Sequence, residues 1–155
     1  MSHKQYDIYK PNSSNAGCAF SFKIVETDKE GNSQKPSFLV QSIKQASWNS
    51  QKRTGSFSAN AKDPEKNIYF KLGENEVGGM LNAIENYAEF SAYHSYNDDK
   101  TQISFKPYTK KNGQKAFSFS VVKNSTLKFG MGVELSEART LKGLFDLFLF
   151  KYFNY

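Results

Sequence analysis

The sequence predicts an α+β fold with two antiparallel four-stranded sheets and two helices, in the chain order of four strands, a helix, four strands and a helix. Apolar and aromatic side chains recur at every second position in many segments, which is the periodicity of half-buried strands. Turn-forming residues separate these runs, and residues 74–87 and 136–153 have helical periodicity instead. We expect one domain over residues 17–155, preceded by an entry segment over residues 1–16.

The first half of the chain is expected to form four strands. The last of them is typical, because Ile68 and Phe70 alternate with Tyr69 and Lys71. The connecting stretches "TDKEGNSQK" and "KDPEK" are charged and rich in turn residues, so they are predicted to be loops. The predicted strands are residues 17–26, 36–47, 53–61 and 67–72.

The first helix is predicted over residues 74–87. Glu74 and Glu76 lie in its first turn, where carboxylates interact favourably with the helix dipole. The stretch "FKLGENEVGGML" that leads into it matches neither a phosphate-binding loop nor a dinucleotide-binding fingerprint. Gly78 and Gly79 are therefore interpreted as positions where the helix packs closely against a sheet. The apolar residues at i, i+3, i+4 and i+7 are Val77, Met80, Leu81 and Ile84.

The second half of the chain is expected to form four more strands in series. Ile103 and Phe105 share one face of their strand, while Lys106 and Tyr108 share the other. An Asn-Gly pair at 112–113 is a strong hairpin signal, because both residues tolerate positive φ. One apolar face and one polar or basic face are typical of an antiparallel sheet covered on one side. The predicted strands are residues 89–96, 101–109, 115–123 and 125–135.

The second helix is predicted to begin at Ser136, a good N-cap residue, and to continue to residue 153. Its core-facing stripe consists of Leu141, Leu144, Phe145, Phe148 and Tyr152. More apolar residues remain than one sheet can cover, so we expect this helix to pack against a second subunit as well. The residues predicted to form that interface are Leu147, Leu149, Phe150 and Phe153.

Residues suited to catalysis or metal binding are scattered. His3 lies near the start of the chain and His94 lies inside an alternating segment, and neither has partners at a useful spacing. Asp98 and Asp99 are adjacent, so their side chains diverge. Cys18 is the single cysteine, which excludes an internal disulfide and a thiolate metal site. The sequence therefore predicts a protein that is not an enzyme, with no catalytic residue, cofactor or metal.

The charge is unevenly distributed along the chain. The net charge is +6, and residues 100–133 contain seven lysines and no acidic residue, whereas residues 72–99 contain six acidic residues and no basic one. Residues 31–62 also lack carboxylates. Arg53 and Arg139 are the only arginines among 21 basic residues. Because lysine is suited to phosphate and arginine to base edges, a nucleic-acid ligand is expected to be bound through its backbone with little sequence preference.

Two motifs suggest a family. A strand ending in F-x-L that leads into x-x-x-E-V/I-G-x-L is matched by Phe70, Leu72, Glu76, Val77, Gly78 and Leu81. An aromatic strand of the EFFHD type is matched loosely by Glu89, Phe90, Tyr93, His94 and Asp98. With the order of elements over residues 65–153, these motifs resemble the Whirly family of single-stranded-nucleic-acid-binding proteins and its relatives around the transcriptional coactivator positive cofactor four. The segment "YDIYK" resembles the family's entry strand, but the basic motif that follows there is missing apart from Lys10.

The resemblance implies two antiparallel sheets packed like propeller blades, helices at the subunit contacts and single strands lying across the sheet surfaces. It also implies self-association as a dimer or tetramer. The expected function is single-stranded DNA binding in DNA replication, recombination, repair or transcription.

Such binding needs lysines for the phosphates and aromatic rings on which bases stack. Lys106 and Tyr108 bring both to one predicted outer face. Trp48 lies among basic residues and is either a stacking residue or a tryptophan of the core or an interface. The residues predicted to bind nucleic acid are Lys44, Trp48, Lys52, Arg53, Tyr69, Lys71, Lys106, Tyr108, Lys110, Lys111, Lys115 and Lys128.

Two other functions stay open at this point. One is an RNA-binding protein or transcription regulator, because stacking does not separate ribose from deoxyribose. The other is an assembly or interaction protein that uses its apolar C-terminal helix. The chain has no apolar run long enough to span a membrane and no signal-like N-terminus, so we expect a soluble intracellular protein without a membrane partner. It would act in the cytoplasm of a bacterial host if a phage encodes it, and otherwise in an organelle or nucleus.

Overall fold

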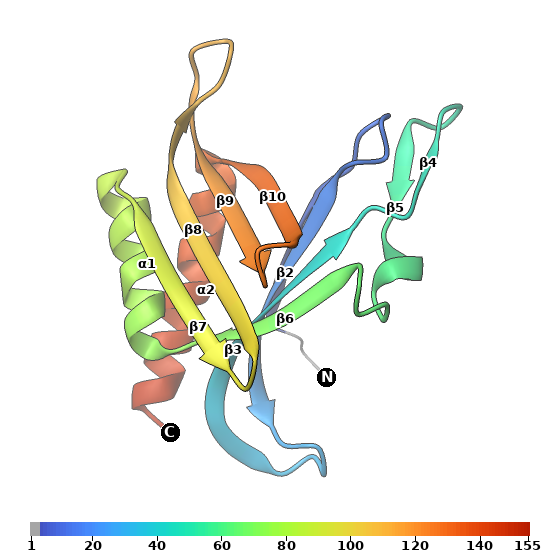
Figure 1. Ribbon diagram of the computed structural model, residues 1–155. Helices are drawn as coiled ribbons and strands as arrows, with labels where there is room; N and C mark the ends of the chain where they lie inside the picture. The colour runs from blue at the N-terminus through green and yellow to red at the C-terminus, as the bar shows by residue number, and fades with distance from the viewer. Residues whose placement is uncertain (1–3) are drawn as a thin grey trace.

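The computed structural model describes residues 4–155, so His3 lies outside the described residues (Figure 1). The strands form sheet 1 in the order β1-β2-β3-β6, sheet 2 in the order β10-β9-β8-β7, and a separate hairpin β4-β5. All pairings are antiparallel. The predicted α+β class with two helices and two four-stranded sheets is confirmed, with a third, two-stranded sheet in addition. The elements are β1 (Gln5–Lys10), β2 (Cys18–Thr27), β3 (Ser33–Lys44), β4 (Ser47–Asn49), β5 (Thr54–Ser56), η1 (Ser58–Asn60), β6 (Asn67–Leu72), α1 (Glu74–Asn86), β7 (Phe90–Tyr96), β8 (Asp99–Thr109), β9 (Lys115–Lys123), β10 (Leu127–Glu134) and α2 (Leu135–Phe153).

The N-terminal segment supplies an edge strand of sheet 1. β1 pairs with β2 along its whole length. It buries Ile8 against the core and leaves Tyr9 exposed, which is the alternation of a strand covered on one side. Residues 5–10 of the expected entry segment therefore belong to the first sheet.

The prediction of one strand over residues 53–61 is wrong. Only Thr54–Ser56 is extended there, and this strand pairs with β4 instead of joining sheet 1. A short 3-10 helix follows, and Nδ2 of Asn60 donates a hydrogen bond to the backbone oxygen of Lys44 at 2.9 Å. This side-chain bond ties the segment to the end of β3, whose two neighbours in sheet 1 are β2 and β6.

Sheet 2 contains all four strands predicted in the second half of the chain. Asn124 and Ser125 have φ values of 53° and 62° in the turn before β10, and Gly113 has a φ of 87° in the turn before β9. Left-handed residues at these positions match the twist of paired strands, as the turn signals predict. Phe105 is buried and Lys106 is exposed, so the predicted division into two faces is also confirmed.

In the first turn of each helix, a glutamate side chain accepts a hydrogen bond from the backbone N–H of the residue three positions earlier. Oε1 of Glu76 accepts from the Gly73 N–H in α1, and Oε1 of Glu137 accepts from the Glu134 N–H in α2, each at 2.9 Å. The predicted N-cap at Ser136 is therefore wrong. Glu134 occupies the N-cap position, and the helix begins at Leu135.

α1 lies closest to sheet 2 at one glycine. A Cβ placed on Gly79 would lie 2.5 Å from Cδ1 of Phe90 in β7, whereas a Cβ on Gly78 would meet no atom within 4 Å. The prediction of close packing is confirmed for Gly79 and wrong for Gly78. Gly79 therefore sets how closely α1 approaches the β7 edge.

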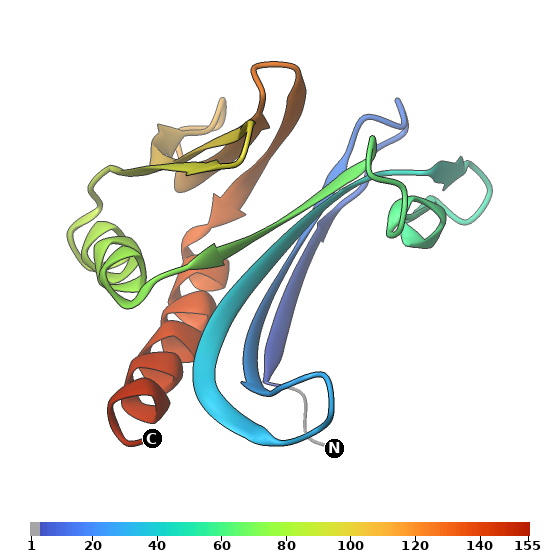
Figure 2. The same ribbon diagram turned by 60° about the horizontal axis from the view of Figure 1, so that its bottom comes forward.

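The core lies between the inner faces of the two sheets and the helices. Phe20 of β2 and Phe119 of β9 have ring centroids 4.7 Å apart, and Phe38 of β3 lies 4.8 Å from Phe145 of α2. α2 thus packs against strands of both sheets. Figure 2 shows the two sheets at an angle to each other, with both helices on the same side of sheet 2. Each sheet keeps a second face that is turned away from this core.

α2 has more apolar surface than the sheets cover. Phe150 and Phe153 expose 67% and 71% of their surface, and Leu147 is also exposed. Leu149, which was predicted to contact another subunit with these three, packs partly against the core instead. The predicted inner stripe is confirmed: Leu141, Phe145 and Phe148 are buried, and Leu144 and Tyr152 are partly buried beside them.

Candidate nucleic-acid interface

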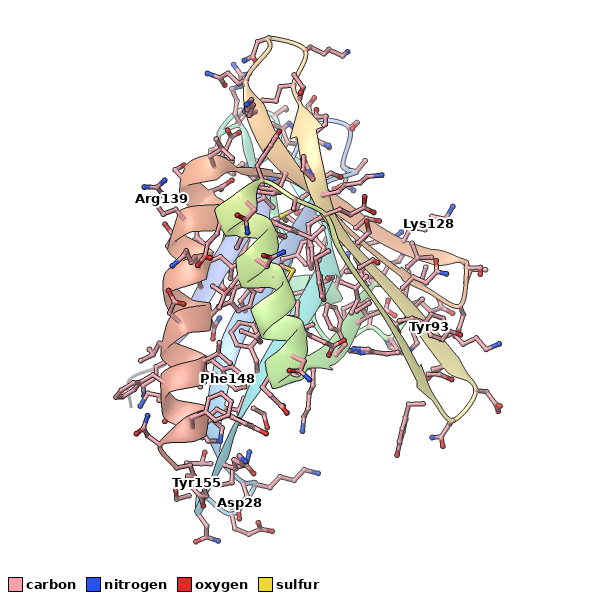
Figure 3. All side chains as sticks on the ribbon, turned by 90° about the vertical axis from the view of Figure 1, so that its left-hand side faces the viewer. Asp28, Tyr93, Lys128, Arg139, Phe148 and Tyr155 are labelled. Carbon is pink, nitrogen blue, oxygen red and sulfur yellow. The ribbon has the colours of Figure 1, made fainter. Side chains whose placement is uncertain are left out.

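The face of sheet 2 that is turned away from the helices, hereafter the outer face of sheet 2, carries two exposed tyrosines. Tyr93 is 55% exposed and Tyr108 is 43% exposed. The strand register places Tyr93, Gln102, Val122 and Lys128 in one row across the four strands. Figure 3 shows Tyr93 and Lys128 on this side of the sheet, away from α2. Tyr108 lies about 20 Å further along β8 than Gln102, given the rise of about 3.3 Å per residue in a strand.

Small residues separate these two ends of the outer face of sheet 2. The ring of Tyr108 lies over Gly132, since its Cε1 atom is 3.9 Å from where a Cβ of that glycine would be. The two intervening rows consist of Ser91, Ser104, Ser120 and Gly130, and of Lys106, Ser118 and Gly132. The result is a flat strip of hydroxyl groups and backbone between two aromatic rings, with one lysine beside it.

The charge on the outer face of sheet 2 is almost entirely positive. Lys100, Lys106 and Lys128 make no ion pair with any residue from 4 to 155. Glu134 is the acidic residue in these rows, and its carboxylate accepts a hydrogen bond from Nζ of Lys110. That hydrogen bond lowers the pKa of Glu134, so at neutral pH the carboxylate is ionised and offsets the charge of Lys110.

The structure separates the three lysines predicted around the β8–β9 turn. Lys111 is exposed, and it makes no ion pair in the part of the chain that the structure describes. Lys110 is bound to Glu134. Lys115 lies on the helix side of sheet 2, where its Nζ is 5.3 Å from the ring centroid of Tyr87. Only Lys111 therefore stays available beside the outer face of sheet 2.

The outer face of sheet 1 is exposed at β6 and partly covered elsewhere. Tyr69 is 59% exposed and Lys71 is exposed, as the alternation predicts. Towards β1 the buried Phe57 packs beside this face with its ring centroid 5.7 Å from that of Tyr9, while Tyr9 itself stays 58% exposed. Nε2 of Gln41 in β3 also donates to the backbone oxygen of Ala61 at 3.2 Å. Residues after β5 thus lie across part of this sheet.

Trp48, Lys52 and Arg53 lie on the hairpin β4-β5, which projects from the end of sheet 1 opposite the helices (Figures 1 and 2). Trp48 pairs with Gly55 and is partly exposed. It is not one of the residues of the hydrophobic core, so the alternative of a core tryptophan is wrong. Trp48 is available for stacking or for a subunit contact, at a distance from the outer face of sheet 2.

Lys44 is on the inner side of sheet 1, beyond the last phenylalanines of the core. Its Nζ lies 5.7 Å from the ring centroid of Phe129 in β10. Lys44 therefore projects into the gap between the sheets and lines a cavity there together with Lys128. The structure brings these two predicted residues together, although they are far apart in the sequence.

Two exposed tyrosines on the outer faces of the sheets, Tyr93 and Tyr9, are absent from the predicted site. Tyr93 alternates with the inward residues Ala92 and His94, and Tyr9 follows the buried Ile8. The alternation in both segments was sufficient to place these rings on outer faces. The pairs Tyr69/Lys71 and Lys106/Tyr108 marked the predicted faces, because a lysine and a tyrosine two residues apart share one face of a strand. Neither Tyr93 nor Tyr9 has a lysine at this spacing.

The titratable groups outside these faces have structural roles. Nε2 of His94 lies 2.6 Å from Oε2 of Glu76, a contact that links β7 to α1. Cys18 is buried, and burial raises the pKa of its thiol, so the thiol is protonated at neutral pH. No group of three or more His, Cys, Asp or Glu side chains within residues 4–155 is arranged to hold a metal ion. Neither helix of this range combines the length and apolarity needed to cross a membrane.

Comparisons of the chain with family models, with curated proteins and with solved structures gave no match. The resemblance to the Whirly family therefore rests on the motifs within residues 65–153 and on the order of the elements.

Proposed function

We propose that the protein binds single-stranded DNA on the outer face of sheet 2, with little preference for sequence. The observation that carries this proposal is one sheet face with two exposed tyrosines, three lysines that form no ion pair within residues 4–155, and one carboxylate that is already paired. Stacking of a base on an aromatic ring contributes about 1–3 kcal/mol, and it tolerates any base. The binding energy therefore comes from features that all sequences share.

The tyrosines and the lysines of this face bind different parts of the strand. Tyr93 and Tyr108 stack on bases, and the unpaired lysines bind phosphates as mobile point charges. The strip of serines and glycines between the rings lets the strand lie close to the sheet. Duplex DNA hides its bases from such a face, so single strands are preferred.

Other predicted residues offer similar contacts, most of them away from this face. Tyr69 and Lys71 offer the same pair of contacts on sheet 1, and Trp48, Lys52 and Arg53 offer them on the β4-β5 hairpin. Lys111 adds charge beside Tyr108. We assign these residues a secondary part, because sheet 1 is partly covered by its own chain.

The two sheets, in our proposal, have the propeller-like packing of Whirly proteins, and α2 forms the contact between subunits of a dimer or tetramer. Leu147 and Phe150 are exposed on α2, and Gly143 stands one turn before Leu147 with open space where a Cβ would be. The spacing of four and three residues from Gly143 to Phe150 is that of a helix–helix seam. The glycine leaves room for a large side chain of the second helix.

The test is a fluorescence titration of the protein with labelled oligonucleotides of mixed sequence. We expect binding to single strands, weaker binding to the matched duplex, and an affinity that falls steeply with salt because counterions are released. No binding at low salt, or equal affinity for duplex, would contradict the proposal. Competition between DNA and RNA of the same sequence then decides whether RNA is the ligand instead.

The exposed end of α2 favours a second candidate function, an assembly protein that acts through this helix alone. Light scattering with and without Phe150→Glu separates the two candidates. For a DNA-binding oligomer, we expect the substitution to dissociate the subunits while each one keeps the tyrosines of sheet 2. A monomeric wild-type protein that binds no oligonucleotide would favour a partner protein for α2.

A further inference from the structure

A basic cavity lies where the two sheets diverge. Its volume is about 510 Å³, and it is bounded by the end of β3, the loop before β2, the loop before β6 and the edge strand β10. Three lysines from three different segments line it, namely Lys44, Lys66 and Lys128. The phenylalanines of the core fill the space between the sheets further in, so the cavity is the polar end of the same gap.

The positive charge in this cavity is not neutralised by the protein. None of the three lysines makes an ion pair with a residue in the range 4–155, and no carboxylate is among the residues that line the cavity. Like charges placed around one space repel each other, and an anion between them removes that repulsion. The cavity therefore fits a ligand with more than one negative charge.

The walls of the cavity are fixed by hydrogen bonds. The Lys44 N–H donates to the backbone oxygen of Lys66 at 2.9 Å, and the side chain of Asn60 holds the Lys44 carbonyl. The buried side-chain oxygen of Gln45 accepts from the Gly17 N–H at 3.1 Å and from the Asn12 N–H at 3.0 Å. The backbone positions that carry Lys44 and Lys66 are thus tied to each other before any ligand arrives, which lowers the entropic cost of binding.

Lys128 joins the cavity to the outer face of sheet 2. It ends the row that begins at Tyr93, and the two residues lie three strand spacings apart, which is about 14 Å. A strand that stacks on Tyr93 and follows this row across the sheet reaches the β10 edge at Lys128. Lys128 and Gly130 of this edge strand are among the residues that line the cavity.

We propose that this cavity is a phosphate-binding site formed by Lys44, Lys66 and Lys128. Lysines that line one cavity from three segments can approach a tetrahedral oxyanion from different sides, and its oxygens accept hydrogen bonds from several directions. The part of the proposal that assigns the phosphate to a bound single strand rests on the proposed function. A phosphate at the end of the strand, a phosphate within it and a free nucleotide share this chemistry.

The first experiment uses probes that do not require strand binding. Inorganic phosphate and thymidine 5′-monophosphate are titrated into isotope-labelled protein, and backbone amide shifts are followed by NMR. We expect saturable shifts at Gly17, Gln45 and Gly130, which border the cavity, and their loss in Lys44→Gln. Shifts that are absent, or that spread over all lysine-rich surfaces, overturn the phosphate site.

The second experiment measures oligonucleotide affinity for Lys44→Gln and Lys66→Gln. Lys66 is exposed, so its substitution changes the cavity without disturbing the core. We expect each variant to bind roughly tenfold more weakly, the effect of one hydrogen bond to a charged group, with a lower salt dependence. Lys29→Gln is the control with the same charge change, because Lys29 is exposed and follows Asp28, which lies at the far end of sheet 1 (Figure 3). Equal behaviour of cavity and control variants contradicts the role of the cavity in strand binding.

The two experiments together show where the bound phosphate comes from, and they test the phosphate site separately from the proposed function. A greater loss for 5′-phosphorylated than for 5′-hydroxyl strands assigns the site to a strand end, and equal losses assign it to a phosphate within the strand. Localised shifts with phosphate but no oligonucleotide binding support the site and contradict the proposed function. Oligonucleotide binding that both cavity variants retain, without localised phosphate shifts, contradicts the site and leaves the proposed function standing.

Discussion

The outer faces of the two sheets share one sequence pattern and differ in the chain segments that lie across them. Both alternate inward apolar residues with outward polar, lysine and tyrosine residues. Residues that follow β5 lie across part of sheet 1, where Phe57 packs near Tyr9 and Ala61 binds Gln41. The middle rows of sheet 2 consist of serines and glycines together with Lys106. Alternation therefore identifies outward residues, whereas the path of distant loops decides which outward residues a ligand can reach.

The largest expected effect comes from removing the rings of sheet 2. Tyr93→Ala combined with Tyr108→Ala should weaken single-strand binding by at least about thirtyfold, since each stacking contact contributes about 1–3 kcal/mol. The matched control on sheet 1 is Tyr9→Ala combined with Tyr69→Ala, and we expect a smaller loss. Fluorescence titration at one salt concentration measures both variants. A greater loss for the control would assign the main interface to sheet 1.

Substitutions at two neighbouring glycines test the packing of α1 against β7. Gly79→Ala should lower the free energy of unfolding by about 1–3 kcal/mol, because the added methyl group meets the ring of Phe90. Gly78→Ala adds the same group to open space and should raise the free energy of unfolding by up to about 1 kcal/mol through its helix propensity. Urea denaturation measures the difference. Equal effects of the two changes would mean that α1 does not depend on this contact with β7.

The smallest expected effect concerns the carboxylate on the outer face of sheet 2. Glu134→Gln releases Lys110 and should raise single-strand affinity by up to about fivefold, the range of an exposed ion pair. Because Lys110 lowers the pKa of Glu134, the wild-type carboxylate stays charged at neutral pH and is neutralised only as the pH falls below the usual glutamate range. The gain from Glu134→Gln should therefore be present at pH 7 and shrink in acid. If Glu134→Gln leaves the affinity unchanged at pH 7, the strand does not pass near Glu134 and Lys110.

Local patterns were sufficient to predict the second half of the fold. β7 to β10 combine strict alternation with turn residues that adopt positive φ, and α2 has an unbroken apolar stripe, so neighbouring elements reinforce one another. The first half depends on contacts between distant segments. β6 pairs with β3 across residues 45–66 and takes the edge that residues 53–61 were predicted to share, and β1 pairs across a loop with β2. No local pattern records such contacts.

The same distinction applies to the candidate site. Alternation was sufficient to predict that Tyr108, Lys106 and Lys128 face outward. It also predicts this of Tyr93, which the predicted site lacked. The pairing of Lys110 with Glu134, and the position of Lys115 over Tyr87, depend on side-chain contacts between elements. The cavity that brings Lys44 to Lys128 depends on how the two sheets meet, which no single segment specifies.

The most direct test of the central claim is photocrosslinking of the protein to a single strand that carries 5-iododeoxyuridine, followed by mass spectrometry of the crosslinked peptides. If the strand lies on the outer face of sheet 2, the crosslinks will map to Tyr93 and Tyr108. They will diminish when unlabelled single strands compete and persist when duplex competes. Crosslinks confined to Trp48, to Tyr69 or to the aromatic residues of α2 would contradict this assignment.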